Sequence, residues 1–256
     1  MSVGFTRFLA VVFVGLIAAP ALAQPAGPAG TLAYKGDLVV APASVVGAFT
    51  YTTNGGWAPV RISLVARHQT TGLLFMGAAQ QLVAGNATAT VAGLPNGKYD
   101  CWALMNIEDG QKNKQIIAPT PGAFKVNLTV VGVNAPALAG SVGWSNVNPN
   151  PAGGVNQITG KLDSSWNQGW NCVLAPAGLQ LVAIPTGGGR VHSLGAVPLN
   201  TPNMNNQITI GGVNARNDYT VIGTLALEQK NAQDQVIGTQ LLSTGFVNNI
   251  TVTNPP

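Results

Sequence analysis

Charged residues are scarce in this sequence. They make up 8% of the chain, against about 25% in typical globular proteins. The 12 basic and 8 acidic residues leave a net charge of +4, and the nearest approach to a basic cluster, Lys112 with Lys114, fits a solvated hairpin tip. Nucleic-acid binding relies on clustered basic side chains that displace phosphate counterions. The sequence therefore predicts no nucleic-acid partner.

Groups that carry catalysis are also few. The two histidines, His68 and His192, lack the H-x-x-x-H or H-x-H spacing of a metal site. The chain has no G-x-S-x-G, S-x-x-K or G-x-x-x-x-G-K motif. Glu108 and Glu228 occupy matching places in different copies of an internal repeat, which favours solvated strand ends over a pair of catalytic carboxylates. We therefore expect no cofactor, no metal and no catalytic residue.

Cysteine is limited to Cys101 and Cys172. Two cysteines cannot by themselves make a structural zinc site, which needs four ligands. In an oxidising compartment they form either one disulfide or two buried thiols. The first alternative predicts a Cys101–Cys172 bridge between the two copies of the repeat, and the second predicts two independent thiols.

Apolar runs long enough to cross a membrane are missing as well. Residues 8–19 are an unbroken apolar run, preceded by Arg7 and followed by the A-x-A sequence of residues 21–23. This run is shorter than the ~20 residues of a membrane-spanning helix, and its flanks are those of a secretory signal peptide. We predict a signal peptide over 1–23, a mature chain from Gln24 without a transmembrane segment, and export to the periplasm, cell surface or extracellular space.

An internal repeat organises the rest of the chain. Residues 47–57 match residues 160–170 without a gap, with Gly, a large apolar residue, Asn, Gly and Trp in register. Further blocks match in the same order: 64–66 with 181–183, 77–78 with 195–196, 91–94 with 210–213, 107–108 with 227–228, and 111–113 with 229–231. We predict one domain over 24–133 and a second over 134–256, joined near the Asn-Ala-Pro sequence 134–136.

Each copy has the pattern of short strands separated by Gly, Pro and Asn. No window has a sustained helical period with capping residues. The expected strands are 48–53, 60–68, 88–91, 99–107 and 124–131 in the first copy, and 157–162, 179–184, 207–210, 219–227, 235–242 and 246–252 in the second. The predicted fold class is all-β, with two tandem antiparallel β-sandwich domains.

One segment carries a resemblance to known modules. A strand, a tight turn and a strand beginning with Tyr, seen in the sequence G-L-P-N-G-K-Y of residues 93–99, resembles immunoglobulin-like, fibronectin-type-III-like and prealbumin-like sandwiches. The resemblance implies a tyrosine corner at Tyr99 and at Tyr219, in which the hydroxyl binds the backbone just upstream. It departs from the immunoglobulin pattern because Cys101 has no partner in its own copy and Val221 takes its place in the second.

Aromatic and amide side chains gather at one turn of the second copy. Trp170 has a counterpart in Trp57, which favours core packing over a ligand platform. Trp166 has no aromatic counterpart, and with Trp170 and Trp144 it either presents stacking faces to a sugar or covers a seam between domains. The predicted ligand-binding residues are Trp166, Asn167, Trp170 and Asn171.

Three classes of function remain open. The first is a non-catalytic exported structural or adhesion-type protein, whose weakly charged strand edges permit self-association or binding to other envelope proteins. The second is a module that binds glycans or another ligand at Trp166 and Trp170. The third is a secreted enzyme of unknown reaction, for which His68 and His192, with the two glutamates, are the only candidates.

Overall fold

The computed structural model describes residues 27–145, 151–173, 178–195, 204–215 and 218–254. Over these residues every regular element is a β-strand, and the strands form antiparallel sheets. The predicted all-β class is therefore confirmed. The predicted signal peptide, 1–23, lies outside the described residues.

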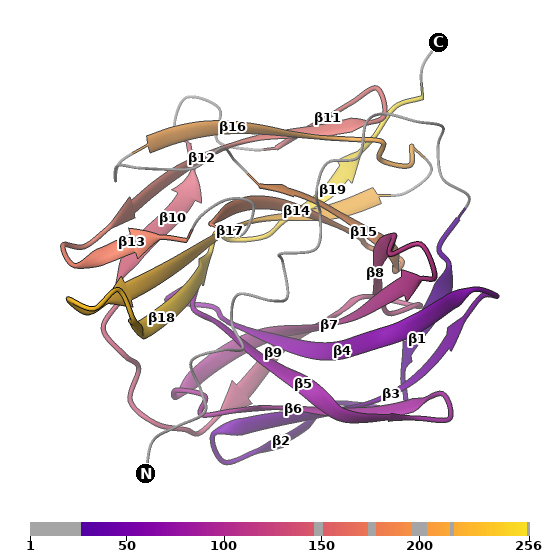
Figure 1. The fold of residues 1–256 in the computed structure, drawn as a ribbon, viewed down its shortest axis with the longest axis horizontal. Helices are drawn as coiled ribbons and strands as arrows, with labels where there is room; N and C mark the ends of the chain where they lie inside the picture. The colour runs from indigo at the N-terminus through magenta and orange to yellow at the C-terminus, as the bar shows by residue number, and fades with distance from the viewer. Residues whose placement is uncertain (1–26, 146–150, 174–177, 196–203, 216–217, 255–256) are drawn as a thin grey trace. The chain divides into compact units, whose positions relative to one another are not determined.

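The described chain divides into two compact units (Figure 1). The N-terminal unit comprises Ala23–Pro136 together with Ile184–His192. The C-terminal unit comprises Ala137–Ala183 and Ser193–Pro256. A short segment of the second copy therefore belongs to the unit that the first copy forms.

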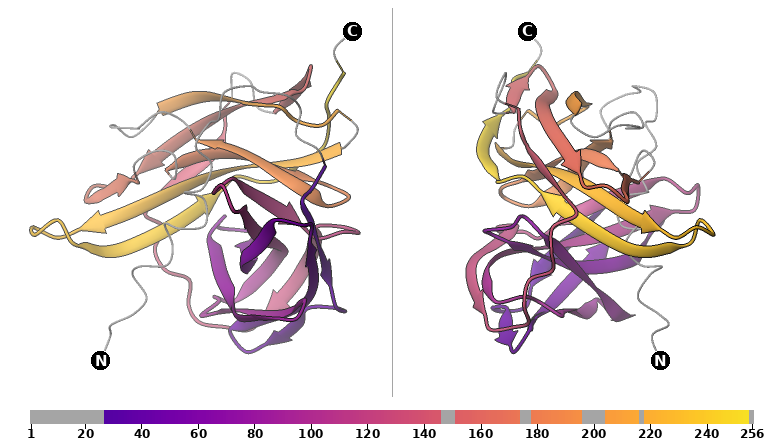
Figure 2. Two further views of the ribbon diagram at one scale, coloured as in Figure 1. Left: turned by 45° about the vertical axis from the view of Figure 1, so that its right-hand side comes forward. Right: turned by 90° about the vertical axis from the view of Figure 1, so that its left-hand side faces the viewer.

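The N-terminal unit contains β1 (Gly30–Tyr34), β2 (Val39–Ala41), β3 (Ser44–Thr53), β4 (Trp57–His68), β5 (Leu74–Val83), β6 (Asn86–Ala92), β7 (Gly97–Asp109), β8 (Lys114–Ala118) and β9 (Phe124–Val130). One layer has the order β1-β3-β6-β5, with β2 on β3. The other has the order β5-β4-β7-β8, with β9 on β7. Because β5 pairs with both β4 and β6, it joins the two layers, which curve around a common interior (Figure 2).

The core of this unit lies between its two layers. In β6, buried and exposed residues alternate strictly, so that Ala87, Ala89 and Val91 face inward. This is the period expected of a strand with one solvated face. The central part of β7 is buried on both faces. Phe49 and Tyr99 are both fully buried in this core, where each such side chain contributes about 1.5–3 kcal/mol through burial of its apolar surface.

The N-terminal unit also includes the first four residues of a strand from the second copy. The strand β15 (Gly189–Gly195) follows a glycine-rich turn, as the 187–189 run predicts. Gly189, Arg190 and Val191 pair with β8 in antiparallel register, Val191 opposite Ile116. The free edge of β8 is thereby covered.

The C-terminal unit contains β10 (Gly140–Trp144), β11 (Ala152–Gly154), β12 (Gln157–Trp166), β13 (Trp170–Cys172), β14 (Leu179–Pro185, ending in the segment of the other unit), β16 (Met204–Gly211), β17 (Asp218–Lys230), β18 (Val236–Ser243) and β19 (Val247–Thr251). In a four-stranded sheet, β10, β11 and β16 all pair with the central strand β12 (Figure 1). Strand β17 pairs with β13, β14, β18 and β19.

Local geometry repeats between the copies. The Tyr99 hydroxyl donates to the Pro95 carbonyl at 2.8 Å, and the Tyr219 hydroxyl donates to the Asn214 carbonyl at 3.2 Å. Both predicted tyrosine corners are therefore confirmed. Each hydroxyl gains a backbone partner at a position where the ring is fully buried, which avoids the cost of an unpaired polar group in the interior.

Candidate functional site

The predicted ligand residues lie on the turn between β12 and β13. The Asn167 backbone N–H donates to the Ala139 carbonyl at 2.8 Å, and its side-chain Nδ2 donates to the Leu138 carbonyl at 2.8 Å. The Asn167 carbonyl accepts from the Trp170 N–H at 3.1 Å. The side-chain amide thus ties the turn to the segment just before β10.

The same turn occurs in the first copy. Asn54 makes the corresponding contacts, its N–H donating to the Ala29 carbonyl at 2.8 Å and its Nδ2 to the Pro28 carbonyl at 3.4 Å. Gly56 and Gly169 both have φ of +85°, a left-handed conformation that favours glycine. The Asn-x-Gly-Trp pattern is thus explained as a turn motif.

The aromatic residues beside this turn are half-buried. A Cβ placed on Gly238 would come within 3.2 Å of the Trp170 indole, so this ring packs over β18. Trp166 pairs with Gly140 at the end of β12, and Asn171 is exposed on β13 opposite Glu228. Ligand binding by these residues and Asn167 stays a prediction.

The two cysteines are free thiols, each buried within its own unit. Burial, with a smaller contribution from the Asp100 carboxylate, raises the pKa of Cys101 to about 12. Burial and the Glu228 carboxylate raise the pKa of Cys172 to about 11. Since the thiolate is the reactive form, both thiols are inert as nucleophiles near neutral pH, and the bridge between them stays a prediction.

The histidines and recurring glutamates lie in separate places. His68 accepts from the Thr71 N–H at 3.2 Å through Nδ1 and contacts the Asn96 carbonyl through Nε2 at 3.1 Å. Glu108 forms an ion pair with Lys112 at 2.6 Å, and Glu228 with Lys230 at 3.4 Å. In the part of the chain that the structure describes, no group of three or more His, Cys, Asp or Glu side chains is placed to hold a metal ion.

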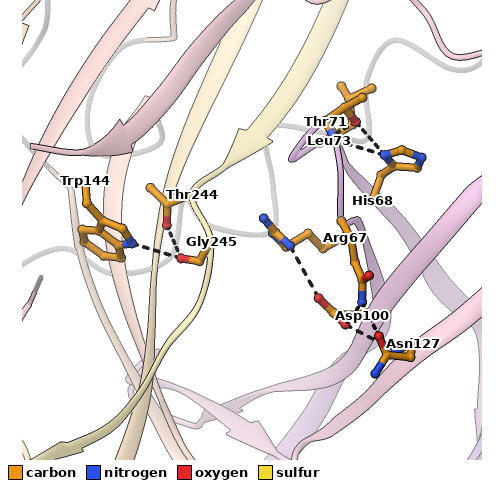
Figure 3. A network of polar contacts seen from close by, with 10 residues as sticks. Arg67, His68, Thr71, Leu73, Asp100, Asn127, Trp144, Thr244 and Gly245 are labelled. Carbon is orange, nitrogen blue, oxygen red and sulfur yellow. Dashed lines mark hydrogen bonds and ion pairs between the residues drawn. The ribbon is translucent and has the colours of Figure 1, made fainter. Parts of the chain in front are cut away.

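A buried polar cluster beside His68 escaped the sequence analysis (Figure 3). Arg67 and Asp100 are 8% and 7% exposed, and their charged groups approach to 3.5 Å. Asp100 also accepts from Gln69 Nε2 at 2.7 Å and from the Asn127 N–H at 3.4 Å. Because the carboxylate is held by several donors, the cluster ties the end of β4 and the start of β7 to the middle of β9.

A shallow hollow lies on the outward side of the four-stranded sheet of the C-terminal unit. Its volume is about 410 Å³, within the range of roughly 300–1,000 Å³ usual for small-ligand sites. Strands β10, β12 and β16 line it with Ser141, Val142, Gly143, Trp144, Asp163, Ser164, Ser165 and Asn205. Trp144 is among them, whereas Trp166, Asn167, Trp170 and Asn171 are not.

Polar groups converge on this hollow. The Ser141 and Ser165 hydroxyls are hydrogen-bonded at 2.8 Å, and Asn205 Nδ2 donates to Ser145 Oγ at 2.6 Å. Trp144 pairs with the buried Leu162 and lies on the opposite face of the sheet, where its Nε1 donates to the Gly245 carbonyl at 3.1 Å (Figure 3). On that buried face of β12, the Ser164 hydroxyl has no hydrogen-bond partner within the described chain.

The neighbouring strand β16 presents a sheet edge. In the first copy, β6 pairs with β3 on one side and with β5 on the other. In the second copy, β16 pairs with β12, and its opposite edge has no partner among the described strands. The strand carries no charged residue and no proline, so it lacks the usual protection of an edge strand against further pairing.

Comparison with known proteins identifies no family. No family model and no curated protein sequence matches the chain. Among solved structures, a marsupial T cell receptor matches with a TM-score of 0.27 and 10% sequence identity, over 87% of this chain and 98% of the receptor chain. At this TM-score we draw no argument from the match. No helix among the described residues is long and apolar enough to span a membrane.

Proposed function

We propose that this protein is a non-catalytic, exported structural or adhesion-type protein that self-associates through the edge of β16. The observation that carries the proposal is the uncharged outer edge of β16, which has no partner among the described strands, whereas its counterpart in the first copy is covered by β5. We further propose that the units are immunoglobulin-like or prealbumin-like modules, supported by the two tyrosine corners.

The proposed occupant of the edge is β16 of a second copy. Asn205, Gln207 and Thr209 alternate with residues facing the interior, among them Ile208 and Ile210. An antiparallel pairing centred on one residue places outward side chains opposite outward ones and inward opposite inward. No charge opposes a like charge in this arrangement, and the pairing closes as a two-fold dimer.

The test is a charge placed on the edge. Gln207→Glu lies opposite Lys161 in the β12–β16 ladder, so the variant gains a cross-strand ion pair and keeps its fold. At the same time it places like charges together in the two-fold pairing. We expect the chain from Gln24 to dimerise with rising concentration in size-exclusion chromatography with light scattering, and the variant to remain monomeric at tenfold higher concentration or more.

The matched control is Thr88→Glu. Thr88 occupies the corresponding position of β6, opposite Ala48, where the edge is already paired with β5. We expect this variant to dimerise as the parent does. A parent chain that stays monomeric at all concentrations, or two variants that behave alike, would contradict the proposal.

A further inference from the structure

The hollow on β10, β12 and β16 contains a carboxylate that forms no ion pair within the described chain. Asp163 is half-buried, and it has no hydrogen bond or ion pair with another described residue. Beside it lie the hydroxyl pair of Ser141 and Ser165 and the carboxamide of Asn205. The carboxylate accepts hydrogen bonds strongly, and the carboxamide both donates and accepts them. These two groups and the two hydroxyls face the same hollow.

The floor of the hollow is open because of a glycine. A Cβ added to Gly143 would meet no atom within 4 Å, and Gly143 pairs with Asp163 in the β10–β12 ladder. Directly opposed residues share one face of a sheet. The backbone of β10 is therefore exposed beside the carboxylate, where a ligand can approach closely.

The first copy has the same strand pairing and the same hydroxyl pair as this hollow, but it lacks the carboxylate and the glycine. There Thr31 and Thr52 form the equivalent hydroxyl pair at 2.7 Å. Ala33 stands where the second copy has Gly143, and Thr50 stands where it has Asp163. The free carboxylate and the open floor are thus additions of the second copy, which a common sheet scaffold does not require.

The charge around the hollow defines the class of ligand. A phosphate or another anion is repelled by Asp163. Lys161 stands two residues away on the same face of β12, so the surface is locally neutral and attracts cations weakly. A single carboxylate is also too little negative charge for a tight calcium site. A neutral ring with adjacent hydroxyl groups fits, because a carboxylate accepts two such hydrogen bonds and an amide donates and accepts.

We propose that this hollow binds a neutral carbohydrate ring, with Asp163 and Asn205 holding its hydroxyl groups above Gly143. The site is independent of the edge pairing, since it lies on the face of the sheet and the pairing lies along its margin. A dimer that binds no sugar and a monomer that binds one are therefore distinguishable results.

The test is a titration of the ¹⁵N-labelled chain from Gln24, followed by amide chemical shifts. The probes are the methyl glycosides of glucose, mannose, galactose and N-acetylglucosamine, with methylammonium chloride as the cationic alternative. We expect at least one glycoside to shift the amides of Gly143, Asp163 and Asn205. Methylammonium is expected to leave these amides unshifted.

Variants separate a binding role from a structural one. Asp163→Asn is expected to weaken sugar binding by about tenfold or more, because a charge-assisted hydrogen bond is lost. Gly143→Ala restores the residue of the first copy and is expected to fold normally while weakening binding, since its methyl group enters open space. Asp218→Asn, which removes an exposed carboxylate elsewhere in the unit, is the control and should bind like the parent.

Several outcomes would overturn the proposal. Shifts caused by methylammonium alone would make the hollow a cation site. Shifts at Trp166 and Trp170 in place of Gly143 and Asp163 would move the sugar site to the turn between β12 and β13. Absence of shifts with every glycoside, in a chain whose thermal unfolding is cooperative, would show that the hollow binds none of these sugars.

Discussion

The imidazole of His192 is buried in β15, close to the Arg190 side chain of the same strand. Burial, with a smaller contribution from the positive charge of Arg190, lowers its pKa from 6.5 to about 4. The folded protein therefore holds this histidine neutral under conditions in which the unfolded chain protonates it.

Acid should consequently weaken the fold as the pH falls below 6.5. The folded pKa is depressed, so the stability from the neutral imidazole is complete above pH 6.5 and is lost as the pH falls toward about 4. Between pH 7.5 and pH 5 we expect the free energy of unfolding to fall by about 2 kcal/mol. Urea unfolding at both pH values measures this difference.

A matched variant assigns that loss to one residue. His192→Gln removes the titrating group and keeps a polar side chain of similar size. The difference in unfolding free energy between pH 7.5 and pH 5 should then shrink by most of its value. An unchanged pH dependence in this variant would place the titrating group elsewhere in the molecule.

Apart from Trp144, the residues of the hollow were missed because none of them is informative alone. Serine, glycine and asparagine are common, and Asp163 is one of several scattered acidic residues. Only the registers of β10, β12 and β16 bring them to one face. A signal was present in the repeat, since Gly143 and Asp163 replace Ala33 and Thr50 within otherwise matching strands.

Among the elements, the turn before β13 illustrates how a sequence pattern can serve architecture. Asn167 and Asn54 each use their amide to tie the turn to the chain before β10 or β1. Asn167 is one of the amides that suggested a ligand-binding surface beside Trp166 and Trp170. Its side chain makes this structural hydrogen bond. The recurrence of Asn, Gly and Trp in both copies is accounted for by the shared turn.

Replacing that amide should destabilise the fold. For Asn167→Ala we expect a loss of about 1 kcal/mol in unfolding free energy, typical of one lost side-chain hydrogen bond to the backbone. Asn54→Ala should cost less, because its contact with Pro28 is longer, at 3.4 Å. Thermal and urea unfolding of the two variants test the order, and equal or reversed losses would contradict it.

The long strands could be predicted from their sequence, and several short ones could not. The expected runs at 60–68, 99–107 and 219–227 lie within β4, β7 and β17, because continuous apolar and β-branched residues mark strands buried on both faces. By contrast, β5 is rich in alanine and glutamine, and β10 contains two glycines within five residues. Neither composition favours a strand, so these two are held by pairing with their neighbours.

At the scale of the whole molecule, the copies share a scaffold and differ in what they add. The N-terminal unit adds the buried Arg67–Asp100 cluster, whose aspartate is matched by Thr220 in the second copy. The C-terminal unit adds the hollow and an edge of β16 that no described strand covers. A repeat unit that retains its turns and tyrosine corners can thus carry different surfaces.

Whether the two cysteines are free or joined in a disulfide concerns both units of the chain. Titrating the thiols with a thiol reagent distinguishes the two states. With two free thiols buried as in the structure, the folded chain should react slowly with a thiol reagent at pH 8. The same chain unfolded in guanidinium chloride without reductant should release two equivalents. No thiol released on unfolding would instead establish the predicted bridge between Cys101 and Cys172.

The placement of β15 on β8 has a consequence for the order in which the molecule is completed. A chain is made from its N-terminus, so Lys114–Ala118 exists long before Gly189–Gly195. The N-terminal unit includes Ile184–His192, and its sheet therefore cannot be finished when the first copy has emerged. The outer edge of β8 therefore stays unpaired while much of the second copy is synthesised. A chain whose synthesis stops in between would expose the backbone of β8 to pairing with strands of other chains.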